Sequence, residues 1–417
     1  MSKVCVMGLG YIGLPTSAVL ATNGFEVVGV DVNARVVDTV NSGNIHIKEP
    51  GLHTVVRAAI GSGNLRASLE PEKADVFLLA VPTPLSDDKK ADMSYVRQSA
   101  EAIVPKLERG NLVVLESTSP PGTCRGLIKP ILEKSGMTVG EDIFLAHCPE
   151  RVLPGRILKE LIQNDRVVGG YGRTCAERAR EIYASFVEGN IFLTDVTTAE
   201  MVKVIENTFR DVNIALANEV ALICEELGID FGEVARLANR HPRVNLHTAG
   251  PGVGGHCIAV DPWFLVEEFP QQARLIRLAR ERNDGMPGHV VARTVDLVAG
   301  IKDPKIVALG LAFKGNIDDV RESPSLTVIE QLKQKGFRVA VHDPFVKDGP
   351  AELASIEECF KDADCAVLLT DHADYKYLNP VQLAKLMRTS ILFDTRNFLD
   401  HDEWRKAGFQ VRVLGVG

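Results

Sequence analysis

One glycine-rich segment has the residue types of a nucleophilic site. It runs Gly250-Pro-Gly-Val-Gly-Gly-His-Cys-Ile-Ala-Val-Asp-Pro262, so that Cys257 follows several glycines and Asp261 lies four residues further on. Glycines permit close backbone approach, and a helix starting near Cys257 would lower the pKa of its thiol and favour the nucleophilic thiolate. Asp261, one helical turn away, could hold a water molecule near the sulfur, or could cap a helix that begins at Pro262. The segment predicts covalent catalysis by Cys257.

A second set of polar residues has helical spacing. Lys203 and Asn207 are four residues apart, and Arg210 continues the same face of an otherwise apolar helix. Alone, these three residues fit an exposed helix face better than a site, but the cysteine segment favours a polar site. No metal centre is expected around Cys257, because no second cluster of ligands completes one.

The N-terminus carries a dinucleotide-binding pattern. Gly8-Leu-Gly-Tyr-Ile-Gly13 follows a strand-like run and precedes a helical one, and a second strand ends at Asp31, near the expected spacing of about 20 residues. Glycines let the backbone approach a pyrophosphate, and Asp31 can accept from a ribose hydroxyl but would repel a 2′-phosphate. The pattern therefore predicts NAD as the cofactor. The expected contacts are Gly8, Gly10, Tyr11, Ile12, Gly13, Asp31 and Arg35, although Arg35 could be only a solvated helix residue.

Two later loops of the same region carry threonines. Thr83 lies in Val81-Pro-Thr-Pro84 and Thr118 lies in Glu116-Ser-Thr-Ser-Pro120, each following a strand-like run. Loops at the carboxyl ends of parallel strands bind ligands in doubly wound folds, so both threonines are candidates to contact cofactor or substrate. For Thr83 an ordinary turn role is equally consistent.

The elements that must position these residues form two related halves. Short apolar runs at Val4–Met7, Val27–Val30, Val76–Val81 and Leu112–Leu115 alternate with helical segments, which predicts a parallel sheet covered by helices. Three later runs repeat the plan in the same order: 305–312 matches 3–10, 338–343 matches 26–31, and 362–369 matches 73–80.

The intervening chain is helical in pattern. Thr198–Phe209, Ala215–Leu227 and Gln271–Arg282 have helical spacing, and Pro287-Gly288 marks a kink or a new start. The predicted fold is α/β, with two Rossmann-like doubly wound parallel-sheet domains joined by a mostly helical central domain. The expected domains are an NAD-binding Rossmann domain (1–196), a helical central domain that could form a subunit interface (197–300) and a second Rossmann-like domain (301–417).

Composition narrows the class of protein. The 417 residues are 45% hydrophobic and 24% charged, which is typical of a globular protein of two or three domains. A net charge of −8 argues against nucleic acid as the main partner. No apolar run reaches the roughly 18–20 residues that span a bilayer, and the strand-like start leaves no room for a signal peptide, so no membrane association and a cytoplasmic location are expected.

With these motifs identified, the chain resembles the UDP-sugar 6-dehydrogenases (the UDP-glucose/GDP-mannose dehydrogenase family) from Val4 to about Arg396. Beside the dinucleotide loop and the Lys203/Asn207 helix, the likeness rests on three motifs: Cys148-Pro-Glu-Arg-Val-Leu-Pro-Gly155, Gly254-Gly-His-Cys257 and Phe313-Lys-Gly-Asn-Ile-Asp-Asp-Val-Arg-Glu-Ser323. Within the family, two segments favour UDP-N-acetyl-D-mannosamine as the substrate: Arg240-His-Pro-Arg-Val-Asn245 and His256-Cys-Ile-Ala-Val-Asp-Pro-Trp-Phe264. The UDP-glucose branch more often has Lys directly before the aspartate, where this chain has Val260.

The resemblance implies a four-electron oxidation of the sugar alcohol to a carboxylate through a thiohemiacetal and a thioester on Cys257, with two NAD consumed. Lys203 and Asn207 would stabilise the developing charge on oxygen, while Asp261, or Glu150 acting through Thr118, would activate the hydrolytic water. The residues that the resemblance assigns to the nucleotide-sugar are Arg151, Val152, Lys203, Asn207, Arg210, His241, Arg243, Gly254, Phe313, Lys314 and Arg396. It assigns Arg321 to NAD and makes Arg243 a candidate to act across the interface of a homodimer or larger homo-oligomer. It also implies that 197–300 is the dimerisation domain and that 301–417 is the UDP-sugar-binding domain.

Three alternatives stay open at this point. The substrate could be UDP-N-acetylglucosamine or, less consistently, UDP-glucose, because epimers are poorly distinguished by motifs. The protein could be a non-catalytic nucleotide sensor, although Cys257 and Lys203 are both present. An alcohol dehydrogenase that stops at the aldehyde would form one NADH per sugar instead of two.

Overall fold

The computed structural model describes residues 2–86, 88–347 and 349–417, which form two compact units. The first unit comprises Met1–Glu206 and Trp263–Glu268, and the second comprises Asn207–Pro262 and Phe269–Gly417. Among the residues so described, no helix combines the length and apolarity that crossing a membrane requires.

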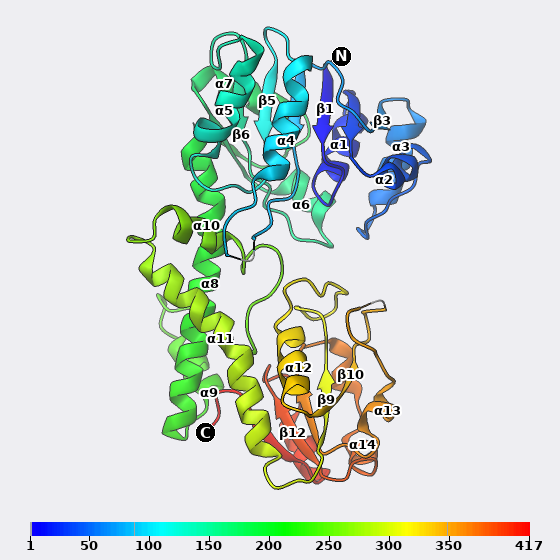
Figure 1. Cartoon of the computed structure of the whole chain (residues 1–417), viewed down its shortest axis with the longest axis vertical. Coiled ribbons are helices and arrows are strands. Elements are labelled where there is room, and N and C mark those ends of the chain that lie inside the picture. Colours follow the sequence, from blue (N-terminus) through cyan, green and yellow to red (C-terminus); the bar gives the residue numbers. More distant parts are fainter. Residues whose placement is uncertain (1, 87, 348) are drawn as a thin grey trace. The chain divides into compact units, whose positions relative to one another are not determined.

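The first unit is built on an eight-stranded sheet (Figure 1), whose strands follow one another in space as β3-β2-β1-β4-β5-β6-β7-β8. Every neighbouring pair is parallel except β6 with β7. The strands are β1 Lys3–Met7, β2 Glu26–Val30, β3 Leu65–Ser68, β4 Val76–Leu79, β5 Leu112–Leu115, β6 Phe144–His147, β7 Arg166–Gly170 and β8 Ile191–Asp195. The sequence located β1, β2, β4 and β5, but β3, β6, β7 and β8 were not predicted. In β3 and β8 no continuous apolar run marks the strand, because several of their side chains are exposed.

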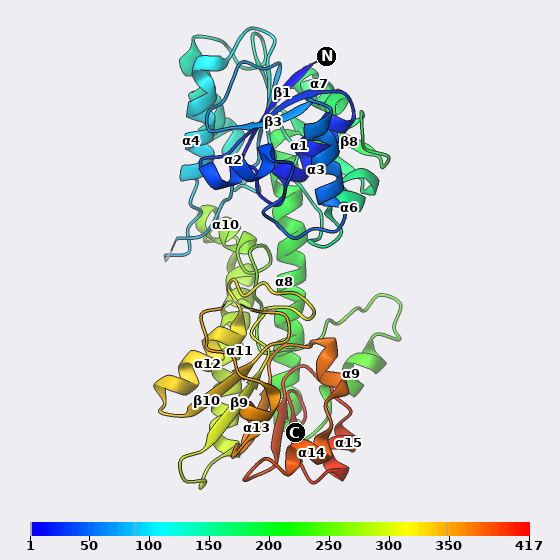
Figure 2. The ribbon, with the colours of Figure 1, turned by 90° about the vertical axis from the view of Figure 1, so that its right-hand side faces the viewer.

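Helices cover both faces of this sheet, since side chains of successive strand residues point to opposite faces. Val4 and Val6 pack into one core with α1, while Cys5 and Met7 pack into the other with α4. Figure 2 shows α1 beside α3 and α6, with α4 on the other side of the sheet. The helices are α1 Gly13–Thr22, α2 Ala34–Asn41, α3 Leu52–Gly61, α4 Ser94–Ile103, α5 Lys129–Leu132, α6 Ile157–Gln163 and α7 Arg173–Tyr183, with short turns η1 Val104–Lys106, η2 Cys124–Ile128 and η3 Glu133–Ser135.

The second unit contains a five-stranded parallel sheet in the order β10-β9-β11-β12-β13. This is the order of β2-β1-β4-β5-β6 in the first sheet, so the repeat predicted from sequence is confirmed. Its strands are β9 Lys305–Leu309, β10 Arg338–His342, β11 Cys365–Leu368, β12 Ile391–Asp394 and β13 Gln410–Val413. Its helices are α12 Pro324–Gln334, α13 Ile356–Phe360, α14 Pro380–Ala384 and α15 His401–Lys406, with the turn η4 Ala373–Tyr377.

The remaining helices are α8 Val196–Leu227, α9 Phe231–Ala238, α10 Asp261–Glu268 and α11 Arg274–Leu297. The two helical runs predicted at 198–209 and 215–227 belong to one uninterrupted helix, α8. Likewise, α11 continues through Pro287, so a new helix does not start there. Proline removes one hydrogen bond from a helix but does not end it when tertiary packing compensates, and α11 packs against α12. The predicted fold class, two Rossmann-like lobes with a helical segment between them in sequence, is confirmed.

Candidate active site

The glycine loop that follows β1 has the geometry of a dinucleotide site. Gly8 has a φ of 95°, its N–H donates to the Val30 carbonyl at 2.7 Å, and a Cβ there would lie 2.7 Å from the Ala80 oxygen. Gly13 begins α1, and its Cβ would lie 1.8 Å from the Gly8 oxygen. At Gly10 a Cβ would meet no protein atom within 4 Å, so packing does not require glycine there. A ligand that approaches the backbone does require it, and these residues therefore fit NAD.

Asp31 directly follows β2 and contacts the same loop. Its carboxylate accepts from the Leu9 N–H at 3.1 Å and from the Asn33 N–H at 2.9 Å. The side chain is half-buried and each oxygen has further lone pairs, so a ribose hydroxyl can still be bound. Arg35 lies in the first turn of α2 and is exposed. Tyr11 is also exposed, and Ile12 precedes α1.

Thr83 and Thr118 are half-buried in the loops that follow β4 and β5. A neighbouring side chain ties these two loops together, since the Ser117 hydroxyl donates to the Val81 carbonyl at 2.7 Å. Sequence reasoning singled out the threonines but not Ser117, which is the residue that fixes the spacing of the loops.

Glu150 belongs to a buried cluster of charges. Its carboxylate pairs with Arg166 at 2.8 Å and accepts from the Arg151 N–H at 2.7 Å. Glu116 lies in the same cluster, where burial raises its pKa to about 7 against the opposing effect of a hydrogen bond from Tyr183. Both oxygens of Glu150 thus have protein partners, and Arg166 holds the carboxylate in place. Sequence reasoning missed Arg166, which has no motif and is identified only by its burial.

The other first-unit candidates are Arg151, Val152 and Lys203. Arg151 pairs with Glu206 of α8 at 2.7 Å, and its guanidinium also donates to the Asp165 carbonyl. Val152 is half-buried against the hydrophobic core. Lys203 is half-buried on α8, one turn before the end of this unit.

Three potential metal ligands also meet in the first unit. Donor atoms of Cys124, His147 and Glu200 lie within 4.8 Å of one another, and all three residues are buried. Glu200, however, accepts from the N–H groups of Gly122 and Cys124, the latter at 2.7 Å, and thereby fixes the loop that leads into η2. Burial lowers the pKa of His147 to about 3. The backbone hydrogen bonds account for Glu200, and we assign no metal ion to this group.

Cys257 lies in the second unit and is exposed. The other seven cysteines, which are distributed over both units, are buried. The Cys257 carbonyl accepts from the N–H groups of Val260 at 3.1 Å and Asp261 at 2.9 Å, and α10 begins at Asp261. Cys257 therefore starts the turn that leads into α10, four residues before the helix itself. Asp261 opens the helix, one residue earlier than predicted.

Asn207, Asp261 and Arg210 form a hydrogen-bonded set in the same unit. The Asn207 amide donates to the Asp261 carboxylate and accepts from the Arg210 guanidinium. Asn207 and Asp261 are 1% and 3% exposed, whereas Arg210 is exposed. An amide held on both sides has a fixed orientation, and Asn207 keeps a second N–H that can donate to a substrate oxygen. Asn207 thus contacts the cysteine segment through Asp261.

A buried polar network also holds the start of the cysteine segment. Arg280 pairs with Asp211, whose carboxylate accepts from Asn283 at 2.8 Å. Asn283 accepts from Asn218 at 2.9 Å, and Asn218 in turn accepts from the Gly250 N–H at 2.9 Å. None of these four side chains is more than 1% exposed. Sequence reasoning missed them, although Asp211 and Asn218, seven residues apart on one apolar helix, were a usable signal.

The middle of the cysteine segment packs on the loop that follows β9. A Cβ at Gly254 would lie 2.7 Å from the Phe313 Cβ, and a Cβ at Gly255 would lie 2.8 Å from the Phe313 ring. The Gly255 N–H donates to the Arg321 carbonyl at 3.1 Å. Glycine is required here because Phe313 occupies the space of any side chain.

The remaining candidates of the second unit differ in their surroundings. Arg396 pairs with Asp371 at 3.0 Å and lies against Gly250, while Arg321 pairs with Asp319 at 2.6 Å. Lys314 is exposed. His241 and Arg243 lie in an exposed segment after α9 and contact each other. The structure thus brings together Cys257, Asp261, Asn207, Arg210, Gly254, Phe313 and Arg396, but places His241 and Arg243 apart from these contacts.

Three family models cover most of the chain in sequence order. Residues 2–187 match the NAD-binding domain of the UDP-glucose/GDP-mannose dehydrogenase family, residues 197–285 its central domain, and residues 307–401 its UDP-binding domain. The chain belongs to this family. It is therefore an NAD-dependent dehydrogenase, and the resemblance inferred from sequence is confirmed.

Individual relatives are similar over nearly the whole chain. A UDP-N-acetyl-D-mannosamine dehydrogenase of Methanococcus maripaludis is 48% identical over 100% of this chain and 98% of its own length. An NDP-N-acetyl-D-galactosaminuronic acid dehydrogenase of Ralstonia nicotianae is 50% identical over 94% of this chain and 95% of its own. The solved structure of the UDP-D-ManNAc dehydrogenase from Pyrococcus horikoshii has a TM-score of 0.94 and 42% identity, covering 100% of this chain and 99% of that one.

Proposed function

We propose that this dehydrogenase oxidises UDP-N-acetyl-D-mannosamine to UDP-N-acetyl-D-mannosaminuronate and consumes two NAD per sugar. The Methanococcus and Pyrococcus relatives, named for that sugar, support the substrate. The exposed thiol of Cys257, one turn before an Asp261 that is held by Asn207, carries the proposal of a covalent mechanism.

The chemistry follows from the residues around that thiol. NAD supplies the hydride acceptor for two successive oxidations. The Cys257 sulfur adds to the carbonyl carbon of the aldehyde, giving a thiohemiacetal, whose oxidation leaves a thioester. Water then cleaves the thioester, releasing the carboxylate and restoring the thiol. Covalent attachment keeps the aldehyde from escaping between the two oxidations.

Asn207 and Lys203 are the proposed donors to the substrate oxygen. Since one Asn207 N–H is taken by Asp261 and its carbonyl by Arg210, the second N–H has a set direction. A fixed donor of this kind contributes on the order of a hundred-fold in rate. We assign the activation of the hydrolytic water to Asp261, with Glu150 acting through Thr118 as the alternative, and proton transfer to Lys203.

The binding roles stay as the resemblance assigned them. Arginines and lysines suit a diphosphate because their hydrogen bonds to it are charge-assisted. We assign NAD to Gly8, Gly10, Tyr11, Ile12, Gly13, Asp31, Arg35, Thr83, Thr118 and Arg321. We assign the nucleotide-sugar to Arg151, Val152, Lys203, Asn207, Arg210, His241, Arg243, Gly254, Phe313, Lys314 and Arg396.

A substrate panel tests the choice of sugar. NADH formed per sugar is measured with UDP-N-acetylmannosamine, UDP-N-acetylglucosamine, UDP-glucose and UDP-N-acetylgalactosamine. The last is the alcohol that corresponds to the uronic acid in the name of the Ralstonia relative. We expect the highest kcat/KM for the first and two NADH per molecule. Faster turnover of any other sugar would falsify the assigned substrate. One NADH per sugar would instead identify an enzyme that stops at the aldehyde.

Two cysteine variants test the covalent step. Cys257→Ser and Cys257→Ala should abolish formation of the acid while NAD binding, followed by fluorescence titration, stays unchanged. Cys175→Ser, at a buried cysteine of α7, is the matched control and should keep the yield of two NADH. A normal acid yield from Cys257→Ala would remove the thioester from the mechanism.

We further propose three functional domains (1–196, 197–300 and 301–417) and a homodimer or larger homo-oligomer formed through the central one. An exposed apolar stripe on α8 supports the oligomer: Phe209, Leu216, Ile223 and Leu227 are 62%, 49%, 50% and 65% exposed, at spacings of seven, seven and four residues. Such a stripe favours burial against another helix. A cytoplasmic location stays a prediction from sequence.

Light scattering coupled to size-exclusion chromatography tests the oligomer. Leu216→Glu and Ile223→Glu should reduce the measured mass to that of one chain. Tyr377→Glu, at an 87% exposed residue of η4, should leave the mass unchanged. A wild-type protein with the mass of a single chain would refute the assembly.

A further inference from the structure

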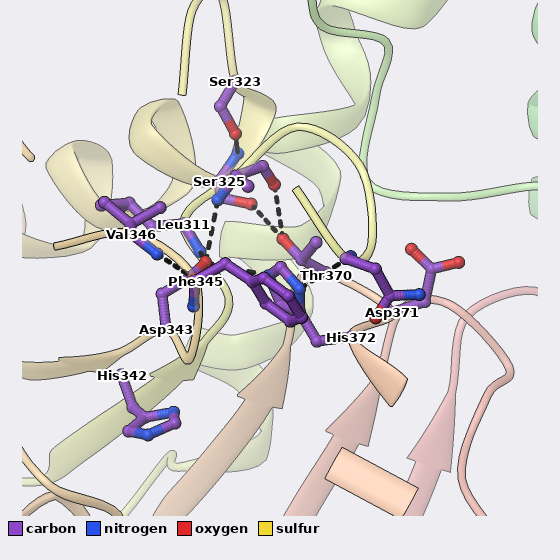
Figure 3. A network of polar contacts seen from close by, with 12 residues as sticks. Leu311, Ser323, Ser325, His342, Asp343, Phe345, Val346, Thr370, Asp371 and His372 are labelled. Carbon is purple, nitrogen blue, oxygen red and sulfur yellow. Dashed lines mark hydrogen bonds and ion pairs between the residues drawn. The ribbon is translucent and has the colours of Figure 1, made fainter. Parts of the chain in front are cut away.

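The loop that carries Phe313 and Lys314 is fixed at both ends by two buried residues of the second lobe (Figure 3). At its start, the Asp343 carboxylate accepts from the Leu311 N–H at 2.7 Å and from the Ala312 N–H at 3.1 Å. At its end, the His372 ring accepts from the Asn316 N–H at 2.9 Å. The loop is therefore clamped on each side of the two residues assigned to the nucleotide-sugar.

The hydrogen bonds of His372 determine its tautomer. Because Nδ1 accepts from a backbone N–H, the ring proton must be on Nε2, which lies 2.9 Å from the Asp343 Oδ2 and donates to it. The ring is 0% exposed, with Phe345 stacked on one face at 5.0 Å and Tyr375 packed edge-on. His372 thus links Asp343 to Asn316 in one orientation.

Further contacts hold the same loop against the chain around His372. The Ala373 N–H donates to the Asn316 side chain at 2.8 Å, and Asn316 adopts a φ of 63°, which costs energy in a residue other than glycine. A Cβ at Gly315 would lie 2.4 Å from the Asp371 oxygen. The Thr370 hydroxyl donates to the Ala312 carbonyl at 2.6 Å. These contacts stabilise a strained turn that would otherwise relax.

The clamped loop is also the surface on which the cysteine segment rests. Phe313 fills the space beside Gly254 and Gly255, which precede Cys257 by three and two residues. A displacement at Asn316 therefore reaches Lys314 directly and the cysteine segment through Phe313. Displacements of about 1 Å can cost two orders of magnitude in rate when they disturb reacting groups.

We propose that His372 is a positioning residue for the UDP-sugar, acting through Asn316 on the loop of Phe313 and Lys314. It touches neither substrate nor cofactor. Its neutral ring accepts one hydrogen bond and donates another, and it thereby transmits the fixed position of Asp343 to the far end of the loop. This inference rests on the proposed function, since it assigns the loop to the nucleotide-sugar.

Three variants separate the two hydrogen bonds of His372. His372→Asn places an oxygen near the position of Nδ1 and keeps the acceptor for Asn316, whereas His372→Gln places an amide near Nε2 and keeps only the donor to Asp343. His372→Phe keeps the ring stacking and removes both bonds. We expect KM for the UDP-sugar to rise about tenfold in the Phe and Gln variants, as the loss of one buried hydrogen bond implies, and to rise least in the Asn variant. KM for NAD should rise less than KM for the sugar.

His342→Gln is the matched control. His342 lies in the same lobe, and its ring contacts Tyr375. Its main-chain carbonyl accepts from the Gly310 N–H, but among the described residues its side chain makes no hydrogen bond to the loop (Figure 3). It should lower thermal stability without changing KM. If His372 had only a structural role, His372→Phe would likewise lower the melting temperature and leave KM for the sugar unchanged. That result would overturn the proposal. An equal rise of KM for the sugar and KM for NAD would also overturn it.

A double-mutant cycle with Lys314→Ala tests the route. If His372 acts by positioning Lys314, the effects of His372→Phe and Lys314→Ala on KM for the sugar will be smaller together than their product. Fully multiplicative effects would show that the two residues act separately and would overturn the route. Binding of UDP to the wild-type enzyme by calorimetry distinguishes this failure from that of the proposed function, because a protein that binds no UDP would contradict the function itself.

Discussion

Gly8 and Gly310 begin loops that are anchored in the same way in the two Rossmann lobes. Gly8 donates to the Val30 carbonyl at 2.7 Å and has a φ of 95°, and Gly310 donates to the His342 carbonyl at 2.8 Å and has a φ of 101°. In each lobe the next N–H, of Leu9 or of Leu311, donates to an aspartate that follows the second strand. The backbone device is thus common to both lobes.

The two aspartates differ in what else they bind. Asp31 is half-buried and accepts two backbone hydrogen bonds. Asp343 is 6% exposed and also accepts from His372, Phe345 and Val346. Although burial opposes it, these hydrogen bonds hold the pKa of Asp343 below its usual range. An aspartate at the equivalent position can therefore face a ligand in the first lobe, as Asp31 can, and hold the protein's own loop in the second lobe, as Asp343 does.

The third residue of each loop follows the same division. Gly10 in the first lobe corresponds to Ala312 in the second, and only Gly10 leaves the backbone open to close approach. We therefore expect the second lobe to bind its ligand through side chains, among which Lys314 and Arg396 are the proposed contacts. A shared fold does not impose a shared mode of binding, because the polar groups at the strand ends can be used internally.

The largest expected effect distinguishes the aspartates by stability. Asp343→Ala would leave several buried N–H groups and the His372 ring without an acceptor, and we expect a loss of about 3 kcal/mol or more in unfolding free energy. Asp31→Ala should lose about 1 kcal/mol, because water can replace the carboxylate. Thermal unfolding followed by calorimetry measures both. Equal losses would show that the two residues do not differ in role.

Gly10→Ala places in the first lobe the residue that the second lobe has at the equivalent position, Ala312. Since no protein atom lies within 4 Å of the new Cβ, the melting temperature should not change, while KM for NAD should rise about thirtyfold, or about 2 kcal/mol. Gly8→Ala is the contrasting variant, because its φ and the nearby Ala80 oxygen predict a loss of stability. An unchanged KM for NAD in Gly10→Ala would contradict the assignment of this loop.

Asp31→Ser removes the charge but keeps an acceptor for the backbone. We expect KM for NAD to rise about tenfold, or about 1.4 kcal/mol, and turnover with NADP to increase because its 2′-phosphate is no longer repelled. Steady-state kinetics with both cofactors measures the ratio. If the preference for NAD is as strong as in the wild type, Asp31 does not set it.

The last comparison concerns Glu116, whose pKa is raised by burial where that of Asp343 is lowered. In the folded protein Glu116 keeps its proton to about pH 7, whereas the unfolded chain loses it near the usual glutamate pKa of 4.5. The folded state binds more protons between these values, so stability from Glu116 falls as pH rises through that window. The stability of Glu116→Gln relative to the wild type should therefore increase between pH 5 and pH 8, measured by urea unfolding. A pH-independent difference would show that Glu116 is already ionised.

Much of the site was predictable because its residue types and spacings are local. The glycine loop with Asp31, the cysteine segment and the Asn207 helix were identified from spacing within about 25 residues, and the family resemblance completed the set. The roles of His372 and Asp343 were not predicted, although the match of 338–343 to 26–31 aligned Asp343 with Asp31. Nothing in a short window indicates that a histidine 29 residues away will reach that aspartate.

The sequence by itself determined the two Rossmann repeats, the cofactor loop and the glycine-rich segment around Cys257, because hydrophobic period, glycine positions and motif spacing act over a few residues. Only the tertiary structure decided that Arg166 would hold Glu150, that Asn218 would hold Gly250, and that α8 and α11 would run unbroken. These outcomes depend on buried polar groups finding partners far along the chain. Which partner is within reach follows from packing, not from any pattern in the neighbouring residues.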